Sequence, residues 1–282
     1  AEAGGSPSGK EAYYSFDFGN VHFVVLDSHD LDRRPGGAMA RWLKADIEKT
    51  KAEWLIAYFH HPPYTKGSHD SDKESQLIEM REHIMPILEG GGVDIVFTGH
   101  SHIYERSMLI DGAYQTPTTA KGVILDDGDG DPEGDGAYRK SKGLVPHNGT
   151  IQVVAGHGGT RVSRKGTMPI MRKILVENGS VLVSVEGDTL SAKMLNLDAT
   201  VRDSFAITKK GVIEHMPIKD PWQPQAKGKA KDPQSAKVLK DGKPLPPVTQ
   251  RIIDHGAQWN YLAGGKHPPE KWTTLKFNHS SW

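Results

Sequence analysis

The sequence contains no cysteine among its 282 residues, which excludes disulfide frameworks, cysteine zinc sites and cysteine nucleophiles. It also lacks any excess of positive charge, because 35 Lys and Arg stand against 35 Asp and Glu, and this balance argues against a nucleic-acid partner. No apolar run approaches the roughly 20 residues that cross a bilayer. We find no targeting signal, and expect either that one was removed or that the chain is a piece of a longer protein.

The residues that are present have the composition of a globular protein. Hydrophobic residues make up 36% of the chain, and 31 glycines add to that apolar share. Fibrous, collagen-like and wholly disordered proteins are therefore excluded. The length fits one large domain or two small ones.

The first hundred residues predict a parallel α/β sheet, because apolar runs of strand length alternate with helical periodicity. Gly19-Asn20 is expected to form a hairpin turn between the first two runs, and Pro86 is expected to kink the second helix. Sheets of this kind bind ligands beyond the carboxyl ends of their strands. The expected strands are 13–18, 21–26, 54–59 and 93–98, and the helical stretches are 39–51 and 74–89.

The next hundred residues have a different pattern, in which short alternating runs predict antiparallel hairpins. Their expected turns are Asn178-Gly179 and Gly187-Asp188, and a long Gly- and Asp-rich loop over about 116–149 precedes them. Composition then changes again, because a stretch rich in Pro and Lys with little apolar pattern is typical of an extended linker. The predicted organisation is a first domain over 1–210, a linker over 211–247 and an incomplete second domain over 248–282.

Three histidines follow the ends of expected strands. His60 comes directly after the apolar run 54–59, and His100 and His102 follow the run 93–98. Imidazoles bind transition metals such as Zn, Fe, Mn and Co, and strand ends hold ligands more firmly than loops do. A single histidine at such a place is most often an ordinary loop residue, but three that converge on one sheet edge favour a metal site.

The stretches AYFHHPPY and FTGHSHIYERS resemble the calcineurin-like metallophosphoesterases, and specifically the purple acid phosphatase branch. The resemblance extends over about residues 11–208. It implies an α/β fold, a β-sandwich flanked by helices, that hydrolyses phosphate esters with two metal ions, Fe with Zn, Mn or Fe. His60 and His100 would bind one ion and His102 the other, while His61 falls on a variable position and is left out of the ligand set.

The resemblance also implies roles for two residues that follow the third expected strand, 54–59. His69 lies at the offset where relatives carry a histidine that contacts phosphate or protonates the leaving oxygen, so it is a candidate catalytic and substrate-binding residue. A plain loop histidine is the equally weighted alternative. Tyr64 is a candidate substrate-binding residue that supports the pocket, whereas Arg106 and Asp27 are expected to be structural.

We expect three earlier motifs of the family, D-x-G, G-D-x-x-Y and G-N-H-E/D, to be missing from this chain. In relatives these motifs supply the carboxylate, tyrosine and asparagine ligands. We therefore expect an N-terminally truncated catalytic domain that is inactive alone and belongs to an active parent hydrolase. The alternative is a non-catalytic binding or structural segment of an exported multidomain protein, and the upstream reading frame distinguishes the two.

Residues 248–282 resemble the opening of a galactose-binding-like β-sandwich, with a Trp-x-Tyr strand followed by a Trp-containing segment. This resemblance implies a second all-β domain and contact with glycans. Relatives in this branch are mostly exported, so we expect a secreted or periplasmic protein with a phosphate ester as substrate.

Overall fold

A computed structural model of the chain describes residues 5–119 and 121–213. The predicted second domain over 248–282 lies outside the described residues, as does the predicted linker from residue 214 onward. Within the described part, no helix is both long enough and apolar enough to pass through a membrane.

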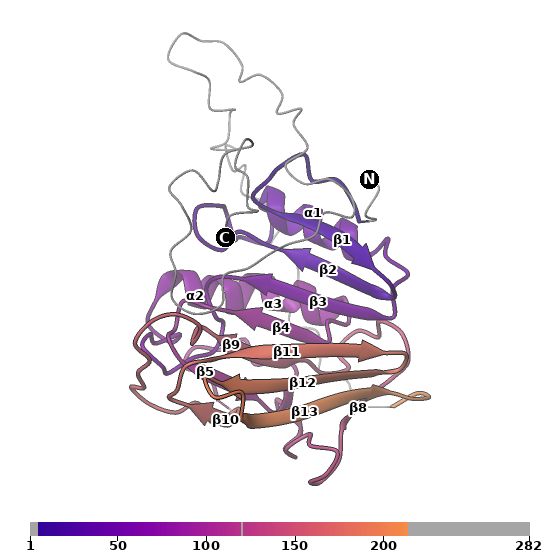
Figure 1. The fold of residues 1–282 in the computed structure, drawn as a ribbon. Helices are drawn as coiled ribbons and strands as arrows, with labels where there is room; N and C mark the ends of the chain where they lie inside the picture. Colours follow the sequence, from indigo (N-terminus) through magenta and orange to yellow (C-terminus); the bar gives the residue numbers. More distant parts are fainter. Residues whose placement is uncertain (1–4, 120, 214–282) are drawn as a thin grey trace, which may run out of the picture. The chain divides into compact units, whose positions relative to one another are not determined.

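The larger sheet has seven strands in the order β1-β2-β3-β4-β9-β5-β10 (Figure 1). Strands β2, β3, β4 and β9 are parallel neighbours, and β1 and β2 form an antiparallel hairpin around Gly19-Asn20. The predicted hairpin and the predicted parallel sheet are thus confirmed. The strands are β1 Tyr14–Phe18, β2 Val21–Val25, β3 Trp54–Phe59, β4 Ile95–Thr98, β5 Tyr104–Ser107, β9 Ile151–Ala155 and β10 Met171–Leu175.

The smaller sheet has four strands in the order β11-β12-β13-β8. The Gly187-Asp188 turn joins β11 to β12 as predicted, but the Asn178-Gly179 hairpin is wrong, because this segment carries the chain from β10 in one sheet to β11 in the other. The loop expected over 116–149 contains two short strands. The remaining strands are β6 Leu109–Ile110, β7 Ile124–Asp126, β8 Tyr138–Lys140, β11 Gly179–Glu186, β12 Thr189–Asn196 and β13 Val201–Lys209.

The second helical stretch is divided differently from the prediction. Instead of one helix kinked at Pro86, a π-helical segment separates two short α-helices, and Pro86 lies in the first turn of the second of them. The missing N–H of proline costs little at that position, because the first N–H groups of a helix have no partner within it. The helical segments are α1 Ala38–Ile47, α2 Ser75–Glu79, η1 Met80–Ile84 and α3 Met85–Gly90.

The helices cover one face of the larger sheet, and the smaller sheet covers the other (Figure 1). Two apolar clusters fill the layers between them. One combines sheet residues with the helices, for example Leu43 and Met85, and the other joins the two sheets through side chains such as Trp54 and Phe205. This arrangement is the predicted β-sandwich flanked by helices.

Buried ion pairs connect the two sheets. Arg106 on β5 contacts Asp203 on β13, with Nε and Oδ2 2.6 Å apart. Asp94, directly before β4, contacts both Lys209 Nζ at 2.9 Å and Lys140 Nζ at 2.7 Å, and all three side chains are at most 1% exposed. Arg106 is thus a structural residue, as expected.

A buried histidine in β2 gives the fold a pH dependence. The His22 ring lies between Asp17, with Nδ1 2.5 Å from Oδ1, and Asp46, with Nε2 2.9 Å from Oδ2. Burial lowers the pKa of His22, but the hydrogen bonds and charges of Asp46 and Asp17 outweigh burial and raise it above 6.5. The stabilising contribution is therefore complete below about pH 6.5 and is lost as pH rises through the raised pKa.

We expect His22→Gln to remove this contribution. The variant should lose on the order of 1 kcal/mol of unfolding free energy at pH 5.5, and less at pH 8.5. Urea unfolding of both proteins at the two pH values measures the difference. An equal loss at both pH values would mean that the His22 charge does not contribute.

Candidate metal centre

His60 and His100 are held by the ends of two neighbouring parallel strands. Phe59 at the end of β3 is paired with Thr98 at the end of β4, and Gly99 N donates to His60 O at 3.1 Å. His100 then adopts a left-handed backbone with φ of 57°. The two imidazoles therefore leave the sheet at adjacent points, as predicted from the sequence.

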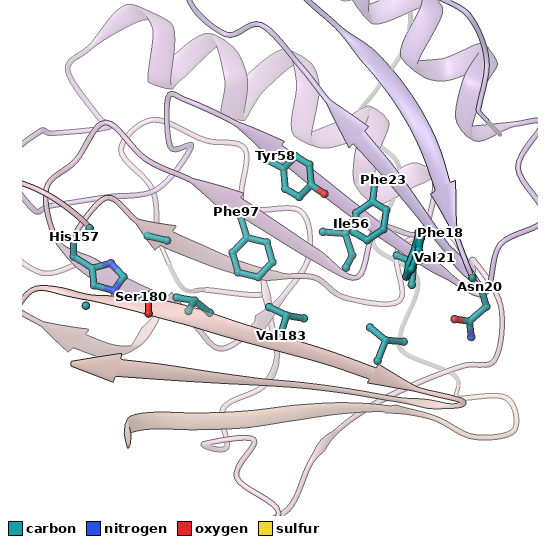
Figure 2. A pocket seen from close by; sticks show the side chains of 16 residues that line it. Phe18, Asn20, Val21, Phe23, Ile56, Tyr58, Phe97, His157, Ser180 and Val183 are labelled. Atoms are coloured by element: carbon teal, nitrogen blue, oxygen red, sulfur yellow. The ribbon is translucent and has the colours of Figure 1, made fainter. Parts of the chain in front are cut away.

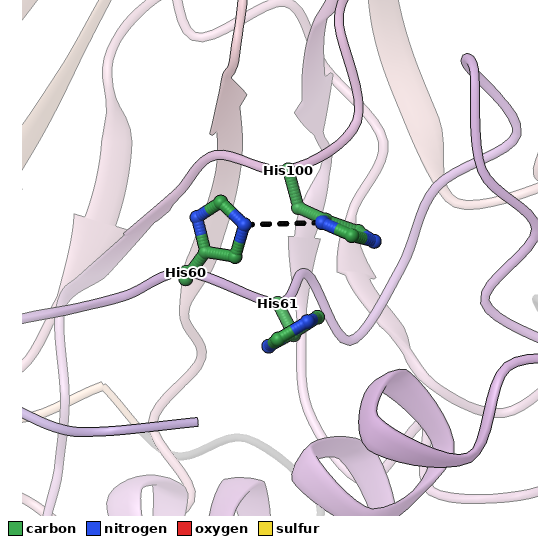
Figure 3. A group of neighbouring side chains, drawn as sticks. All are labelled: His60, His61 and His100. Carbon is green, nitrogen blue, oxygen red and sulfur yellow. Dashed lines mark hydrogen bonds between the residues drawn. The ribbon is translucent and has the colours of Figure 1, made fainter. Parts of the chain in front are cut away.

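The two rings meet edge-on above the sheet, with His60 Nε2 3.0 Å from His100 Nδ1 (Figure 3). Two nitrogens that bind one ion at about 2.1 Å lie roughly 3.0–3.4 Å apart in tetrahedral or octahedral coordination. The observed separation fits two ligands of a single ion. The donor chemistry also fits, because imidazole is a ligand for Zn, Fe and other transition metals.

His61 joins this pair, although the sequence argument left it out. Its ligand atom lies within 4.8 Å of those of His60 and His100, and its side chain is only 3% exposed. The His61 ring also contacts Ser28, since its Nδ1 lies 3.0 Å from Ser28 Oγ. The contact with Ser28 therefore fixes the orientation of the His61 ring beside the pair. The adjacent His-His pair in the sequence was the signal that could have identified it.

A second group joins the carboxylate of Glu74 to two of the site's histidines. Glu74 Oε2 is 2.8 Å from His69 Nδ1 and 3.6 Å from His100 Nε2, and the rings of His69 and His100 lie 3.8 Å apart. His69 thus lies next to the proposed ligands, as its predicted role requires. Glu74 was not identified from the sequence, because a single glutamate before a helix has no distinguishing pattern.

The environment favours neutral imidazoles, which is the form that binds metals. Burial, followed by the charge of neighbouring histidines, lowers the pKa of His60 and of His100. The same two causes lower the pKa of His61 to about 4. The three rings are therefore uncharged at neutral pH.

The other two predicted residues lie apart from this cluster. His102 is half-buried, its backbone N–H donates to Ser68 Oγ at 2.8 Å, and it is in none of the metal-capable groups among the described residues. Tyr64 is 1% exposed and packs in the apolar core on the helical side of the sheet. That position suits packing beneath the site better than contact with a substrate.

Glycine is required where the site segment meets β9. A Cβ at Gly156 would lie 2.1 Å from the backbone oxygen of Ser101, between His100 and His102. Any side chain there would push the histidine segment away from the sheet. Gly156 therefore permits a close approach of the two backbone segments.

Two short stretches match the patterns D-x-G and G-D-x-x-Y, which were expected to be missing, but neither lies at the metal centre. Asp17-Phe18-Gly19 is the end of β1 and its turn, where Asp17 contacts His22. The other, Gly134 to Tyr138, leads into β8, and the Tyr138 hydroxyl accepts from Arg106 at 3.2 Å. Neither contributes to a metal-capable group of the described residues. Asp27 accepts from the backbone of His29 at 2.7 Å, which is the structural role expected of it.

An apolar groove of about 700 Å³ lies between the two sheets (Figure 2). Aromatic residues of the larger sheet, among them Phe23, Tyr58 and Phe97, face Val181 and Val183 of β11 across it. β11 is at the edge of its sheet, and among the described residues no strand pairs with its outer side, although Gly179 N donates to His157 O at 3.2 Å. An edge of this kind is a template for a further strand.

Comparison with known proteins places the fold in a class. The structure of purple acid phosphatase PPD1 from yellow lupin (Lupinus luteus) seeds matches with a TM-score of 0.58 at 23% identity, over 70% of this chain and 32% of that one. The two-sheet architecture is therefore a metallophosphoesterase fold. The model of the family "Calcineurin-like phosphoesterase" matches residues 3–104.

The predicted resemblance to the purple acid phosphatase branch is confirmed by sequence relatives. Purple acid phosphatase 18 of Arabidopsis thaliana is 36% identical over 159 residues, which cover 54% of this chain and 34% of that protein. Purple acid phosphatase 23 of the same plant is 38% identical over 127 residues, 44% of this chain and 27% of that protein. The chain thus spans about a third of the length of these relatives.

Proposed function

We propose that this chain provides part of the metal centre of a phosphate-ester hydrolase. The observation that supports it most is the 3.0 Å separation of His60 Nε2 and His100 Nδ1 at the ends of adjacent parallel strands. In this proposal His60 and His100 hold one metal ion, and His102 contributes to a second. Bound metal ions supply Lewis acids that polarise the phosphate and make water a better nucleophile.

The residues described fit one ion better than two. Two like-charged ions need a bridging carboxylate, and Glu74 is the one carboxylate grouped with these histidines in the described part of the chain. We therefore propose that the other carboxylate and amide ligands come from a segment of the parent protein with the three missing motifs. The apolar groove beside β11 suits that segment, because an added strand would pair with the free edge and cover the aromatic residues.

His69 is proposed to act on the leaving group. Its Nδ1 is engaged by Glu74, so Nε2 is the nitrogen that would donate a proton to the departing alkoxide. Contact between its ring and His100 would keep this proton close to the phosphate. Tyr64 supports the loop from inside.

The ligand assignment is tested by metal content. We expect His60→Ala and His100→Ala each to lose the ion of the shared site, because their nitrogens, 3.0 Å apart, are its proposed ligands, whereas His61→Ala should retain it, because His61 is not one of them. Elemental analysis of the three proteins after loading with Zn and desalting measures occupancy. Metal loss in His61→Ala, with retention in His60→Ala, would reverse the assignment.

The role of His69 is tested in a longer protein that also carries the three motifs. His69→Ala should slow hydrolysis of alkyl phosphates by about 10²–10⁴-fold, and that of activated aryl phosphates much less, because a good leaving group needs no proton. Steady-state kinetics on both esters gives the two ratios. Equal losses would indicate phosphate binding instead of proton donation.

A second candidate is a non-catalytic segment of an exported multidomain protein. The missing carboxylates favour it, and one relative, 35% identical over 107 residues, has the name "Probable inactive purple acid phosphatase 9". In that case an upstream reading frame without the three motifs is expected. Three further proposals follow from the family resemblances. The protein is exported, its metals are Fe with Zn, Mn or Fe, and residues 248–282 contact glycans.

A further inference from the structure

A second group of metal-ligating side chains lies far from His60 and His100. Glu89 is near the end of α3, just before the chain enters β4, and His147 precedes β9, so the group lies at the amino ends of the parallel strands. Asp111 follows β6 and completes it. One ligand atom from each of these three residues lies within 4.8 Å of the others.

Contacts within the group leave one carboxylate oxygen unused. Glu89 Oε2 accepts from the Tyr114 hydroxyl and from Gly112 N at 2.9 Å, but Oε1 is buried without a hydrogen-bond partner. Asp111 Oδ2 lies 3.1 Å from His147 Nδ1, a spacing that also fits two ligands of one ion. An unpartnered buried carboxylate oxygen is costly, so this atom calls for a ligand.

A second buried side-chain oxygen, in the segment that pairs with the neighbour of Asp111, also has no hydrogen-bond partner. The Thr150 hydroxyl is buried and without a partner, and the backbone of Thr150 pairs with Ile110, the neighbour of Asp111. A buried oxygen without a partner calls for an explanation, and Glu89 Oε1 is the one that belongs to the group itself.

The charge of the group points to a cation. Glu89 and Asp111 are 2% and 0% exposed, and two adjacent buried carboxylates repel each other. Burial, and then the charge of Asp111, raise the pKa of Glu89 well above its usual range. A positive ion between them would neutralise this repulsion, and His147, with its side chain 19% exposed, lies on the route from solvent.

We propose that Glu89, Asp111 and His147 form a structural site for a divalent metal ion, separate from the histidine cluster. Two carboxylates with one imidazole suit Mn²⁺, because carboxylates favour hard ions and imidazole favours transition metals. The ion would connect the end of α3, the segment after β6 and the loop before β9. It would thereby stabilise the side of the sheet opposite the catalytic edge.

Mn²⁺ titration of the His60→Ala/His100→Ala protein, followed by electron paramagnetic resonance, tests the site without the histidine cluster. We expect one bound Mn²⁺ per chain, and at least about tenfold weaker binding when Glu89→Gln or His147→Asn is added. Asn suits residue 147 because His147 has a φ of 55°. Asp46→Asn is the matched control, since Asp46 is a buried carboxylate that contacts His22 outside the group.

Thermal unfolding provides a second readout. Mn²⁺ should raise the midpoint of the His60→Ala/His100→Ala protein and of the Asp46→Asn control, but not that of His147→Asn. If Glu89→Gln does not fold, the partly exposed His147 still decides the result. Absence of bound Mn²⁺ at micromolar concentration, or equal binding in His147→Asn and Asp46→Asn, would overturn the proposal in favour of a proton shared by the carboxylates.

Discussion

The 282-residue chain, supplied with Fe, Zn or Mn, should not hydrolyse an aryl phosphate at an enzymatic rate. The described residues offer His60 and His100 for one ion, with Glu74 as the nearby carboxylate, and this set cannot bridge two ions. Adding a separately expressed segment that carries the three missing motifs should restore turnover by several orders of magnitude. A continuous assay of p-nitrophenol release, with and without that segment, measures the effect.

Two neighbouring residues of β11 provide a matched pair for this experiment. Val183→Lys would place a charge in the apolar groove and should block the restoration, whereas Leu182→Lys, on the exposed opposite face, should not. Turnover by the chain alone, lost in Glu74→Gln, would contradict the account and show that Glu74 completes the site. Restoration that is equal in both lysine variants would show that the segment binds elsewhere.

Asp94→Asn should cost about 3–5 kcal/mol of unfolding free energy, a large part of the stability of a typical domain. It would leave the ammonium groups of Lys140 and Lys209 buried between the sheets without their counter-charge. Burial already lowers the pKa of Lys140, so loss of the proton of this lysine would limit the cost. Guanidinium unfolding followed by tryptophan fluorescence measures the change.

The exposed pair of Arg202 and Glu177 is the control, because its Nε and Oε1 atoms are as close, at 2.8 Å, but lie near solvent. Glu177→Gln should cost less than about 1 kcal/mol. A similar small cost for Asp94→Asn would mean that the buried cluster is relaxed by water or by proton loss, and that apolar packing alone joins the sheets.

The sequence predicted those parts of the fold that local pattern controls. Apolar runs located the parallel strands β2, β3 and β4 but not β9, and the Gly19-Asn20 and Gly187-Asp188 turns were correct because turn residues act on their own neighbours. Asn178-Gly179 has the same local character but joins two different sheets. Which sheet a strand enters depends on burial against distant residues, which a turn motif does not encode.

In the site, too, residues marked by a local motif could be predicted, and residues brought together only by folding could not. His60 and His100 could be paired from the sequence because each follows a strand and because the motifs resemble those of a known family. Glu74 could not, since its contact with His69 and His100 arises from the path of the loop before α2. Glu89, Asp111 and His147 come from three segments without any motif, so only the folded chain brings them together.

The central claim is that His60 Nε2 and His100 Nδ1 hold the same ion. Nitrogen-15 NMR of the imidazole groups during addition of Zn²⁺ tests it directly, with resonances assigned through His60→Ala and His100→Ala. The account predicts that these two nitrogens shift to metal-bound values together, at the same Zn²⁺ concentration, and that each variant abolishes the shift of the other residue. A shift of one nitrogen that persists when the other histidine is removed would contradict it.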